Sequence, residues 1–262
     1  MKNLFVIAML TFSAAIGQAE NRITGPADVA KRCTANIPST AQCVENNQKE
    51  TDSGCITPEE RDTLNGYAAF AQCTNVTVRG ETVRVLSGWC ACGCFSNDTR
   101  MAVSDKVTGL LSTATAWETA RNRTKLNLIT LNESLELGEA FTYQHTPIAL
   151  AAAGPEKKSL VVIHTDLGHK LSVTRNHPVV RSDFKMVQAS RLKVGDELLD
   201  QNGARTKIVK ITKEKAKDPV VNFVTTAASD IGHVIFAEGL TVGDMKWQAM
   251  LSDEAKAIDA RR

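Results

Sequence analysis

The sequence has no cysteine after residue 94, no excess of either charge, and no long apolar run after its first nineteen residues. Its 31 basic and 29 acidic residues nearly balance, so composition gives no reason to expect nucleic acid or an anionic membrane as a partner. Without a second apolar run of membrane-spanning length, we expect no integral membrane segment in the mature chain.

The first nineteen residues have the three parts of a secretory signal peptide. Lys2 supplies the positive start, residues 4–16 form the apolar run, and Gly17–Ala19 form a cleavage site of small residues. The apolar run is too short to span a bilayer. We therefore predict cleavage near Ala19 and a secreted or periplasmic mature chain that begins at about Glu20.

The cysteines lie only in the first part of the chain. There are seven, at positions 33, 43, 55, 73, 90, 92 and 94. An exported protein can form lasting disulfides, and six cysteines can form three bridges while one is left over. Residues 20–93 predict a small disulfide-rich α+β leader domain, with a helix over 58–73 that starts in a Thr57–Glu60 capping box and strands within 76–89.

Beyond residue 125 the pattern changes to short strands and turns. A hairpin is predicted around 166–168, and Asn202-Gly203 predicts another between residues 197–199 and 208–211. Further strands are expected at 220–224, 233–236 and 240–242. Residues 104–125 are compatible with a helix or a loop insertion, and 245–262 predict a helical carboxyl-terminal tail. Residues 135–141 and 192–198 resemble each other and suggest a faint repeat.

Four segments in order carry the strongest signal. They are Gly-Cys-Phe at 93–95, Thr-x-x-His at 174–177, A-x-x-L-x-x-G-D at 189–196 and H-x-x-x-A-x-G-L-x-V at 233–242. Together they resemble the Hint domain, the self-processing module shared by Hedgehog proteins and inteins. The resemblance covers residues 94–244 and implies a pseudo-twofold all-β fold, which gives the faint repeat a reason.

The resemblance implies an amino-terminal acyl shift at the bond between Gly93 and Cys94. Cys94 is the nucleophile, and its position next to the Gly93 carbonyl supplies proximity. Thr174 hydrogen-bonds the scissile peptide, which requires a bend after Thr174 since residues i and i+3 point to opposite faces of a strand. His177 supplies a proton to the leaving nitrogen. His233 belongs mainly to carboxyl-side chemistry.

The carboxyl end departs from the splicing pattern. Inteins that splice end in His-Asn followed by Cys, Ser or Thr, whereas this chain has Gly243-Asp244 followed by Met245. Asn222 stands where many family members carry Asp, and the last eighteen residues are too short and too charged for a sterol site. We therefore expect amino-terminal cleavage without splicing, in which water or an external nucleophile such as a surface acceptor resolves the thioester and the leader domain is the substrate.

Alternatives remain at the sequence level. Cys94 could pair with another cysteine in a structural knot, and then the protein would be a secreted binding or structural protein with an inactive Hint fold. A metal clip is not expected, because no histidine lies close enough to complete a tetrahedral site with the 90–94 cysteines. We expect no cofactor. His145, His164 and His169 are taken as structural.

Overall fold

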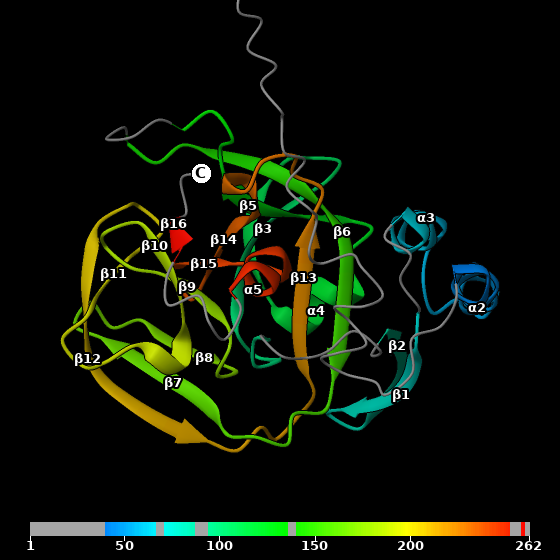
Figure 1. Cartoon of the computed structure of the whole chain (residues 1–262), viewed down its shortest axis with the longest axis horizontal. Helices are drawn as coiled ribbons and strands as arrows, with labels where there is room; N and C mark the ends of the chain where they lie inside the picture. Colours follow the sequence, from blue (N-terminus) through cyan, green and yellow to red (C-terminus); the bar gives the residue numbers. More distant parts are fainter. Residues whose placement is uncertain (1–39, 67–70, 87–93, 136–139, 252–257, 260–262) are drawn as a thin grey trace, which may run out of the picture.

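The computed structural model describes residues 40–66, 71–86, 94–135, 140–251 and 258–259 (Figure 1). The predicted signal peptide lies outside these ranges, so its cleavage stays a prediction. None of the helices in the described ranges has the length and apolar character needed to cross a membrane.

The part before residue 94 contains two helices and a hairpin, on the right in Figure 1. The helices are α2 (Thr40–Asp52) and α3 (Pro58–Gly66), and the strands are β1 (Cys73–Val78) and β2 (Glu81–Leu86). Arg79 and Gly80 both have positive φ, 50° and 84°, as the two-residue turn that joins twisted antiparallel strands requires. Hereafter "the leader" means these described residues, 40–66 and 71–86.

The predicted capping box is present, but the predicted helix was too long. Glu60 Oε2 accepts from the Thr57 amide at 2.9 Å, and the Glu60 amide donates to Thr57 Oγ1 at 3.2 Å. Helix α3 ends at Gly66, and Cys73, predicted to be helical, begins β1 and pairs with Leu86. Residues 67–70 lie in a gap of the described chain. Helix α2 was not predicted.

The rest of the described chain is mainly β, as predicted; we call residues 94–251 the β body. Its strands are β3 (Arg100–Asp105), β4 (Leu111–Thr115), β5 (Leu126–Leu131), β6 (Tyr143–Gly154), β7 (Leu160–Thr165), β8 (Lys170–Val173), β9 (Pro178–Val180), β10 (Lys185–Gln188), β11 (Glu197–Leu199), β12 (Arg205–Glu214), β13 (Val220–Thr225), β14 (Val234–Ala237) and β15 (Leu240–Gly243). Helices α4 (Ala116–Arg121) and α5 (Met245–Met250) join them, with short 3-10 turns at Ala189–Arg191 and Ile231–His233.

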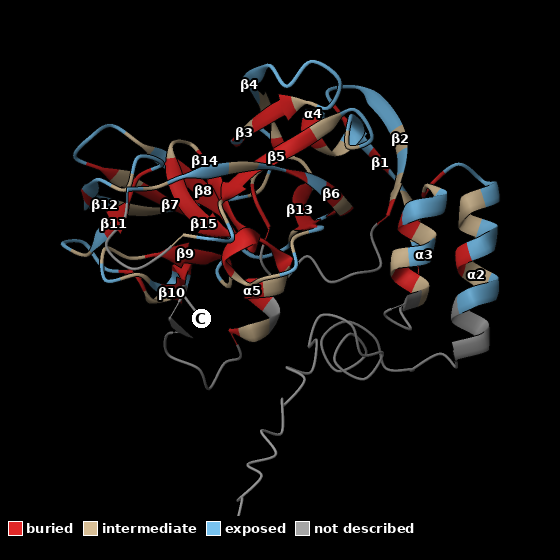
Figure 2. Ribbon diagram, turned by 90° about the horizontal axis from the view of Figure 1, so that it is seen from above, coloured by how far each residue is buried: buried red, intermediate tan, exposed pale blue. Residues whose placement is uncertain are grey.

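Two sheets make up this body. The larger runs β13-β6-β5-β3-β14-β15-β9-β10-β16, where β16 is Ile258–Asp259 and β4 pairs with β3. The smaller runs β11-β12-β7-β8. Figure 2 shows buried residues concentrated on the central strands of the body, between which the main apolar core lies.

Most of the strand predictions were confirmed. Strands β7 and β8 pair around the 166–168 turn, and β11 and β12 pair across Asn202-Gly203. The interpretation of residues 104–125 as a helix or loop insertion missed the end of β3 and the strand β4, but the short helix α4 agrees with it. The tail is helical in α5, whereas Ile258 and Asp259 pair with β10 as a strand. The first copy of the faint repeat includes residues 136–139, which are not described.

Candidate functional site

Phe95 fixes the position of Cys94 because it joins two strands. Its amide donates to the Val221 carbonyl at 2.8 Å, and the Val221 amide donates back to the Phe95 carbonyl at 2.9 Å. Phe95 also bridges Val173 at the end of β8. Its side chain is fully buried. The chain therefore enters the core between β8 and β13 directly after Cys94.

Thr174 holds the backbone of Cys94 from both sides. The Cys94 amide donates to Thr174 Oγ1 at 2.7 Å, and the Thr174 amide donates to the Cys94 carbonyl at 2.8 Å. Both residues are buried. The Cys94 nitrogen is the nitrogen of the Gly93–Cys94 peptide bond, so the hydroxyl contacts one of the atoms that a cleavage reaction there would change. Gly93 itself precedes the described stretch.

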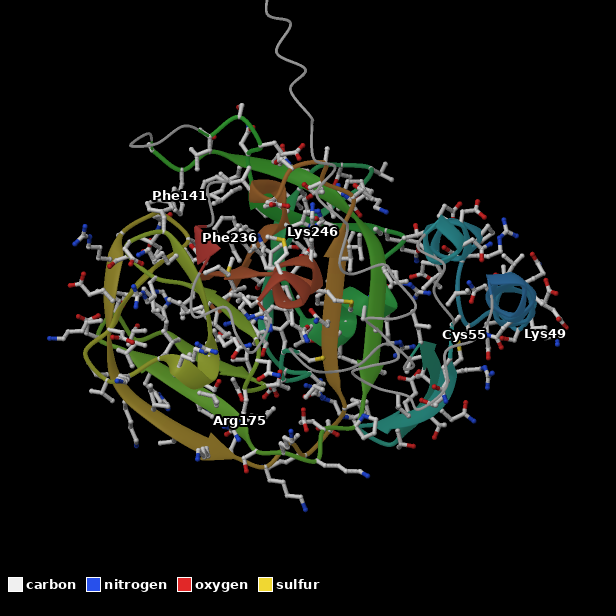
Figure 3. All side chains as sticks on the ribbon, viewed as in Figure 1. Lys49, Cys55, Phe141, Arg175, Phe236 and Lys246 are labelled. Carbon is white, nitrogen blue, oxygen red and sulfur yellow. A yellow bond between two sulfur atoms is a disulfide. The ribbon has the colours of Figure 1, made fainter. Side chains whose placement is uncertain are left out.

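A turn after Thr174 brings His177 back toward the same place. The His177 amide donates to the Thr174 carbonyl at 3.1 Å, which closes the bend that the motif requires. The imidazole of His177 is fully buried and packs against the ring of Phe95, with centroids 4.1 Å apart at an interplanar angle of 60°. The Ala189 amide donates to the His177 carbonyl at 2.8 Å, so the A-x-x-L segment helps to hold this turn. Arg175, labelled in Figure 3, is the exposed residue of the turn.

The side chain of Cys94 lies in an apolar environment. It is 1% exposed and belongs to a small cluster with Leu160 and Val220. One pair of the other cysteines, Cys55 and Cys73, forms a disulfide. Cys33, Cys90, Cys92 and the side chain of Cys43 are not described, so the expectation of three bridges remains a prediction.

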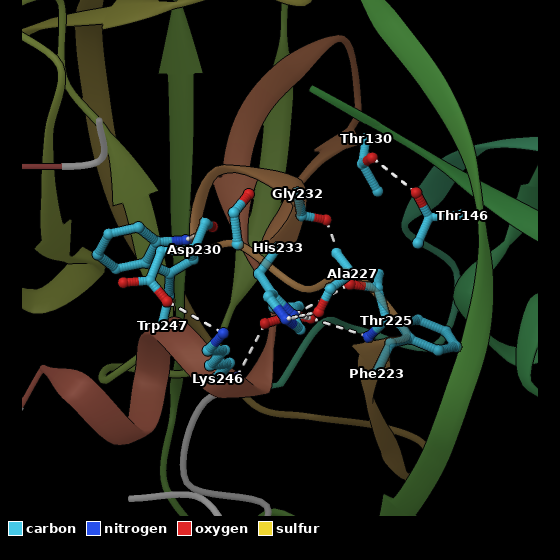
Figure 4. A network of polar contacts seen from close by, with 12 residues as sticks. Thr130, Thr146, Phe223, Thr225, Ala227, Asp230, Gly232, His233, Lys246 and Trp247 are labelled. Carbon is cyan, nitrogen blue, oxygen red and sulfur yellow. Dashed lines mark hydrogen bonds and ion pairs between the residues drawn. The ribbon is translucent and has the colours of Figure 1, made fainter. Parts of the chain in front are cut away.

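His233 forms a second polar group with Asp244 and Thr225. Figure 4 shows His233 beside Thr225. Its Nδ1 lies 2.6 Å from Asp244 Oδ2 and 3.0 Å from Thr225 Oγ1, and its Nε2 lies 3.0 Å from the Ala227 carbonyl oxygen. A carbonyl oxygen can only accept, so Nε2 carries a proton. The His233 ring and the Asp244 carboxyl are both almost completely buried.

Asp244 has several structural contacts, and its role was missed at the sequence level. Its Oδ1 accepts from the Lys246 amide at 2.8 Å, which caps α5, and its Oδ2 accepts from the Thr225 amide at 3.0 Å. Its own amide donates to the His233 carbonyl at 3.0 Å. An Asp directly before a helix is a typical N-cap, and this pattern in the sequence could have predicted the capping role of Asp244. Asp244 is thus a helix cap that also pairs with a buried histidine.

The two groups lie at different places along β13. The Cys94 group meets this strand at Val221, and the His233 group meets it at Thr225, about 13 Å further along at about 3.3 Å per residue. The structure therefore brings Thr174 to Cys94 and His177 to Phe95, and it sets His233 in a group of its own.

Asn222 lies next to Val221 and forms a neutral contact. Its Nδ2 donates to Gln248 Oε1 at 2.9 Å, and its Oδ1 accepts from the Phe223 amide at 2.9 Å. Its side chain is buried. Asn222 thus adds no negative charge beside the Cys94 group, and its amide ties β13 to α5.

Among the described residues, one cluster consists of side chains of the kinds that bind metal ions, but its chemistry does not suit a metal ion. Glu50 lies near Cys55 and Cys73, but the two sulfurs are bonded to each other and are not thiolates.

Comparison with solved structures finds inteins and intein-like domains. An intein from a hyperthermophile is similar over 58% of this chain and 99% of its own length, with 17% identity and a TM-score of 0.49. A DnaB intein from Synechocystis is similar over 58% of this chain and 98% of its own length, with 17% identity and a TM-score of 0.45. A bacterial intein-like domain from Clostridium thermocellum is similar over 58% of this chain and 98% of its own length, with 21% identity and a TM-score of 0.45.

Sequence comparison gives no match. No protein-family model matches the chain, and no curated protein matches it significantly. The identities of these structural matches are below 25% and their TM-scores are below 0.5, so the matches do not assign a chemistry to this chain. Its chemistry follows from its own contacts.

Proposed function

We propose that the protein cleaves its own chain at the bond between Gly93 and Cys94, through an N-to-S acyl shift, and that it does not splice. The observation that carries this proposal is the 2.7 Å hydrogen bond from the Cys94 amide to Thr174 Oγ1. A buried threonine hydroxyl on the nitrogen of the cysteine peptide bond is in the position that this reaction needs.

In the first step the Cys94 sulfur adds to the Gly93 carbonyl carbon. The new C–S bond forms and the C–N bond breaks. His177 gives a proton to the leaving nitrogen and the thiol proton replaces it on the imidazole, so the step is overall an isomerisation from amide to thioester. A neighbouring nucleophile loses no translational entropy when it attacks. In the second step water or an external nucleophile adds to the thioester carbonyl, and the Cys94 thiol leaves.

Thr174 acts selectively on the reacting nitrogen. As this nitrogen gains a proton it takes on positive charge, and its N–H becomes a stronger donor to Thr174 Oγ1. Hydrogen bonds with a charged partner are roughly twice as strong as neutral ones. The contact therefore stabilises the transition state more than the ground state, which is the condition for catalysis.

His177 is the proposed proton donor to the leaving nitrogen. Its ring packs on Phe95, the residue after Cys94, and its backbone is held in the Thr174–His177 turn. A histidine is suited to this task because its ordinary pKa of about 6.5 lets it gain and lose a proton near neutral pH.

The carboxyl side lacks the parts for splicing. Asp244 has no side-chain amide to cyclise, and both of its carboxyl oxygens accept hydrogen bonds, from the Lys246 and Thr225 amides. The residue after it, Met245, offers no nucleophile. We therefore infer that the thioester has no internal acceptor at this end, and that water or an external nucleophile resolves it.

The test uses purified mature protein and hydroxylamine, which attacks thioesters far faster than amides. We expect a leader fragment ending at Gly93 and a fragment beginning with Cys94, both identified by mass spectrometry, and no cleavage in Cys94→Ala. Hydroxylamine is preferable to a thiol, since a thiol would also reduce Cys55–Cys73. If folded protein yields no fragment at this bond, self-cleavage is wrong and a scaffold or binding role takes its place.

A further inference from the structure

The leader and the β body share one apolar core, although the proposed cut falls between them. One cluster of buried side chains combines residues from both sides. Its leader members are Cys55, Ile56, Leu64, Ala71 and Leu86, and its body members are Leu150, Ala152, Val224 and Met245. We call this cluster the docking core. Leu64 is 0% exposed and Leu150 is 1% exposed, as is typical of a domain interior.

The β1–β2 hairpin adds a second contact area. Val76 and Val78 of β1 are buried in the main core cluster, which also contains Trp117 of α4 and Ala151 and Ala153 of β6. Strand β2 also contacts β6 directly. Both strands of the hairpin thus pack on the body.

Two ion pairs cross the same boundary. The Arg123 guanidinium binds both oxygens of Glu60, with Nη2 2.7 Å from Oε2, and donates to the Cys55 carbonyl at 3.3 Å. The Glu60 side chain is 5% exposed and that of Arg123 is 21% exposed. Arg121 pairs with Glu81 at 2.6 Å on the surface. A two-oxygen arginine–carboxylate contact fixes orientation as well as attraction.

The contacts described above are formed by residues on either side of the proposed cut. The docking core, the hairpin contacts and both ion pairs are all formed by residues before 87 or after 93. Cutting the chain within 87–93 therefore leaves every one of them in place. A contact with a buried apolar centre, a polar rim and a bidentate ion pair has the composition of a stable protein–protein interface.

We propose that the leader stays bound to the β body as a second chain after the backbone between Leu86 and Cys94 is cut. The product of cleavage is then a non-covalent complex of two chains, and release of the leader needs a further event. This inference rests on the proposed function for the origin of the cut, but the binding does not depend on it.

The test separates binding from self-cleavage. A recognition sequence for a site-specific protease is inserted between Cys92 and Gly93 in a Cys94→Ala background, in which self-cleavage cannot occur, so that all six other cysteines stay on the leader fragment. After complete cutting, the protein is diluted to low micromolar concentration and passed through a size-exclusion column under native, non-reducing conditions. We expect the two fragments to elute together and to separate only in denaturant.

Two variants examine the interface itself. Arg123→Ala removes the ion pair that crosses the boundary, and we expect it to raise the Kd of the cut complex at least tenfold. Arg205→Ala is the control, because its partner Glu197 lies within the body and the pair is exposed, so the Kd should not change. Circular dichroism of the uncut proteins verifies that both variants fold.

The outcomes are distinct. Separate elution of the fragments from folded, cut protein overturns the docking proposal, whatever the Cys94 protein does with hydroxylamine. Joint elution, combined with no hydroxylamine cleavage of the Cys94 protein, overturns the proposed function and leaves the docking intact. Equal Kd values for Arg123→Ala and Arg205→Ala overturn the assignment of the Arg123–Glu60 pair to this interface.

Discussion

At the scale of single residues, Thr174 is the side chain whose substitution tests the chemistry most directly. Thr174→Val removes the acceptor of the Cys94 amide but keeps a similar shape. An unsatisfied buried donor costs about 1–3 kcal/mol, and each 1.4 kcal/mol is tenfold in rate. We expect cleavage with hydroxylamine to slow roughly ten- to hundredfold. Thr174→Ser keeps the hydroxyl and should retain most of the rate. Equal rates in the two variants would contradict a role for the hydroxyl.

The two histidines should respond differently to replacement by alanine. His177→Ala should slow cleavage by roughly a hundredfold or more, the usual contribution of a general acid. It should also lower stability, because the fully buried ring packs on Phe95 and its removal leaves a cavity.

His233→Ala should slow cleavage less, because His233 lies in a group apart from Cys94. It removes one hydrogen-bond partner of the buried Asp244 carboxyl and leaves the Thr225 and Lys246 amides in place. Losing one buried hydrogen-bond partner costs about 1–3 kcal/mol.

The measurement pairs cleavage rates with urea unfolding of each variant in a Cys94→Ala background. His145→Ala is the control, since His145 is largely exposed and lies on β6, where it contacts Ser104. A small and equal loss of cleavage in His177→Ala and His233→Ala would show that neither acts as proposed.

Part of this arrangement could be predicted from the sequence. Thr174 and His177 are three residues apart, and the need for a bend between them follows from the geometry of a strand alone. The partner of His233 could not be found in this way. Asp244 is eleven residues away, and the two meet because β14 and β15 form a hairpin whose end continues into α5. Such pairs depend on strand register, which a single sequence specifies only weakly where both faces are buried.

At the scale of elements, the predictions succeeded where turn chemistry is local. Asn202-Gly203 and the 166–168 turn each define a hairpin within a few residues. Strand β4, within residues 104–125, was missed because it is mostly exposed at the sheet edge and lacks the alternation of apolar residues that marks a half-buried strand. The helix predicted over 58–73 was extended by apolar spacing as far as Cys73, which begins β1 instead.

Two capping boxes within the described residues offer a matched comparison. Thr57–Glu60 begins α3 and Thr115–Glu118 begins α4, with the same reciprocal hydrogen bonds. Glu60 also binds Arg123, whereas Glu118 is exposed. Glu118→Ala should cost about 0.3–1 kcal/mol as a charge lost from a helix start. Glu60→Ala should cost about 3 kcal/mol or more, since it also leaves Arg123 without its carboxylate.

Urea unfolding at neutral pH measures the loss of unfolding free energy in Glu118→Ala and in Glu60→Ala. The same measurement at acid pH tests the contribution of the Glu118 charge. The Thr115 backbone N–H lowers the pKa of Glu118 below its ordinary value of 4.5. The stabilisation from Glu118 is therefore fully present above pH 4.5, its ordinary pKa, and is lost as the pH falls through the lowered pKa of the folded state. The difference between the wild type and Glu118→Ala should disappear in acid. Equal costs for the two substitutions at neutral pH would show that the Arg123 contact contributes nothing.

At the scale of the whole molecule, the sequence predicts a boundary between residues 93 and 94, and the structure adds a core that crosses it. Because Leu64 and Leu86 pack in one cluster with Leu150 and Val224, we expect the leader hairpin and the β body to unfold together. Native-state hydrogen exchange measures this. In a Cys94→Ala protein, the slowest amides of β1 and β13 should open with the same free energy and the same dependence on denaturant. Leu150→Ala, on the body side, should lower both values by a similar amount, whereas Arg205→Ala should change neither. If β1 opens at a clearly lower free energy than β13, the shared core does not couple the two parts.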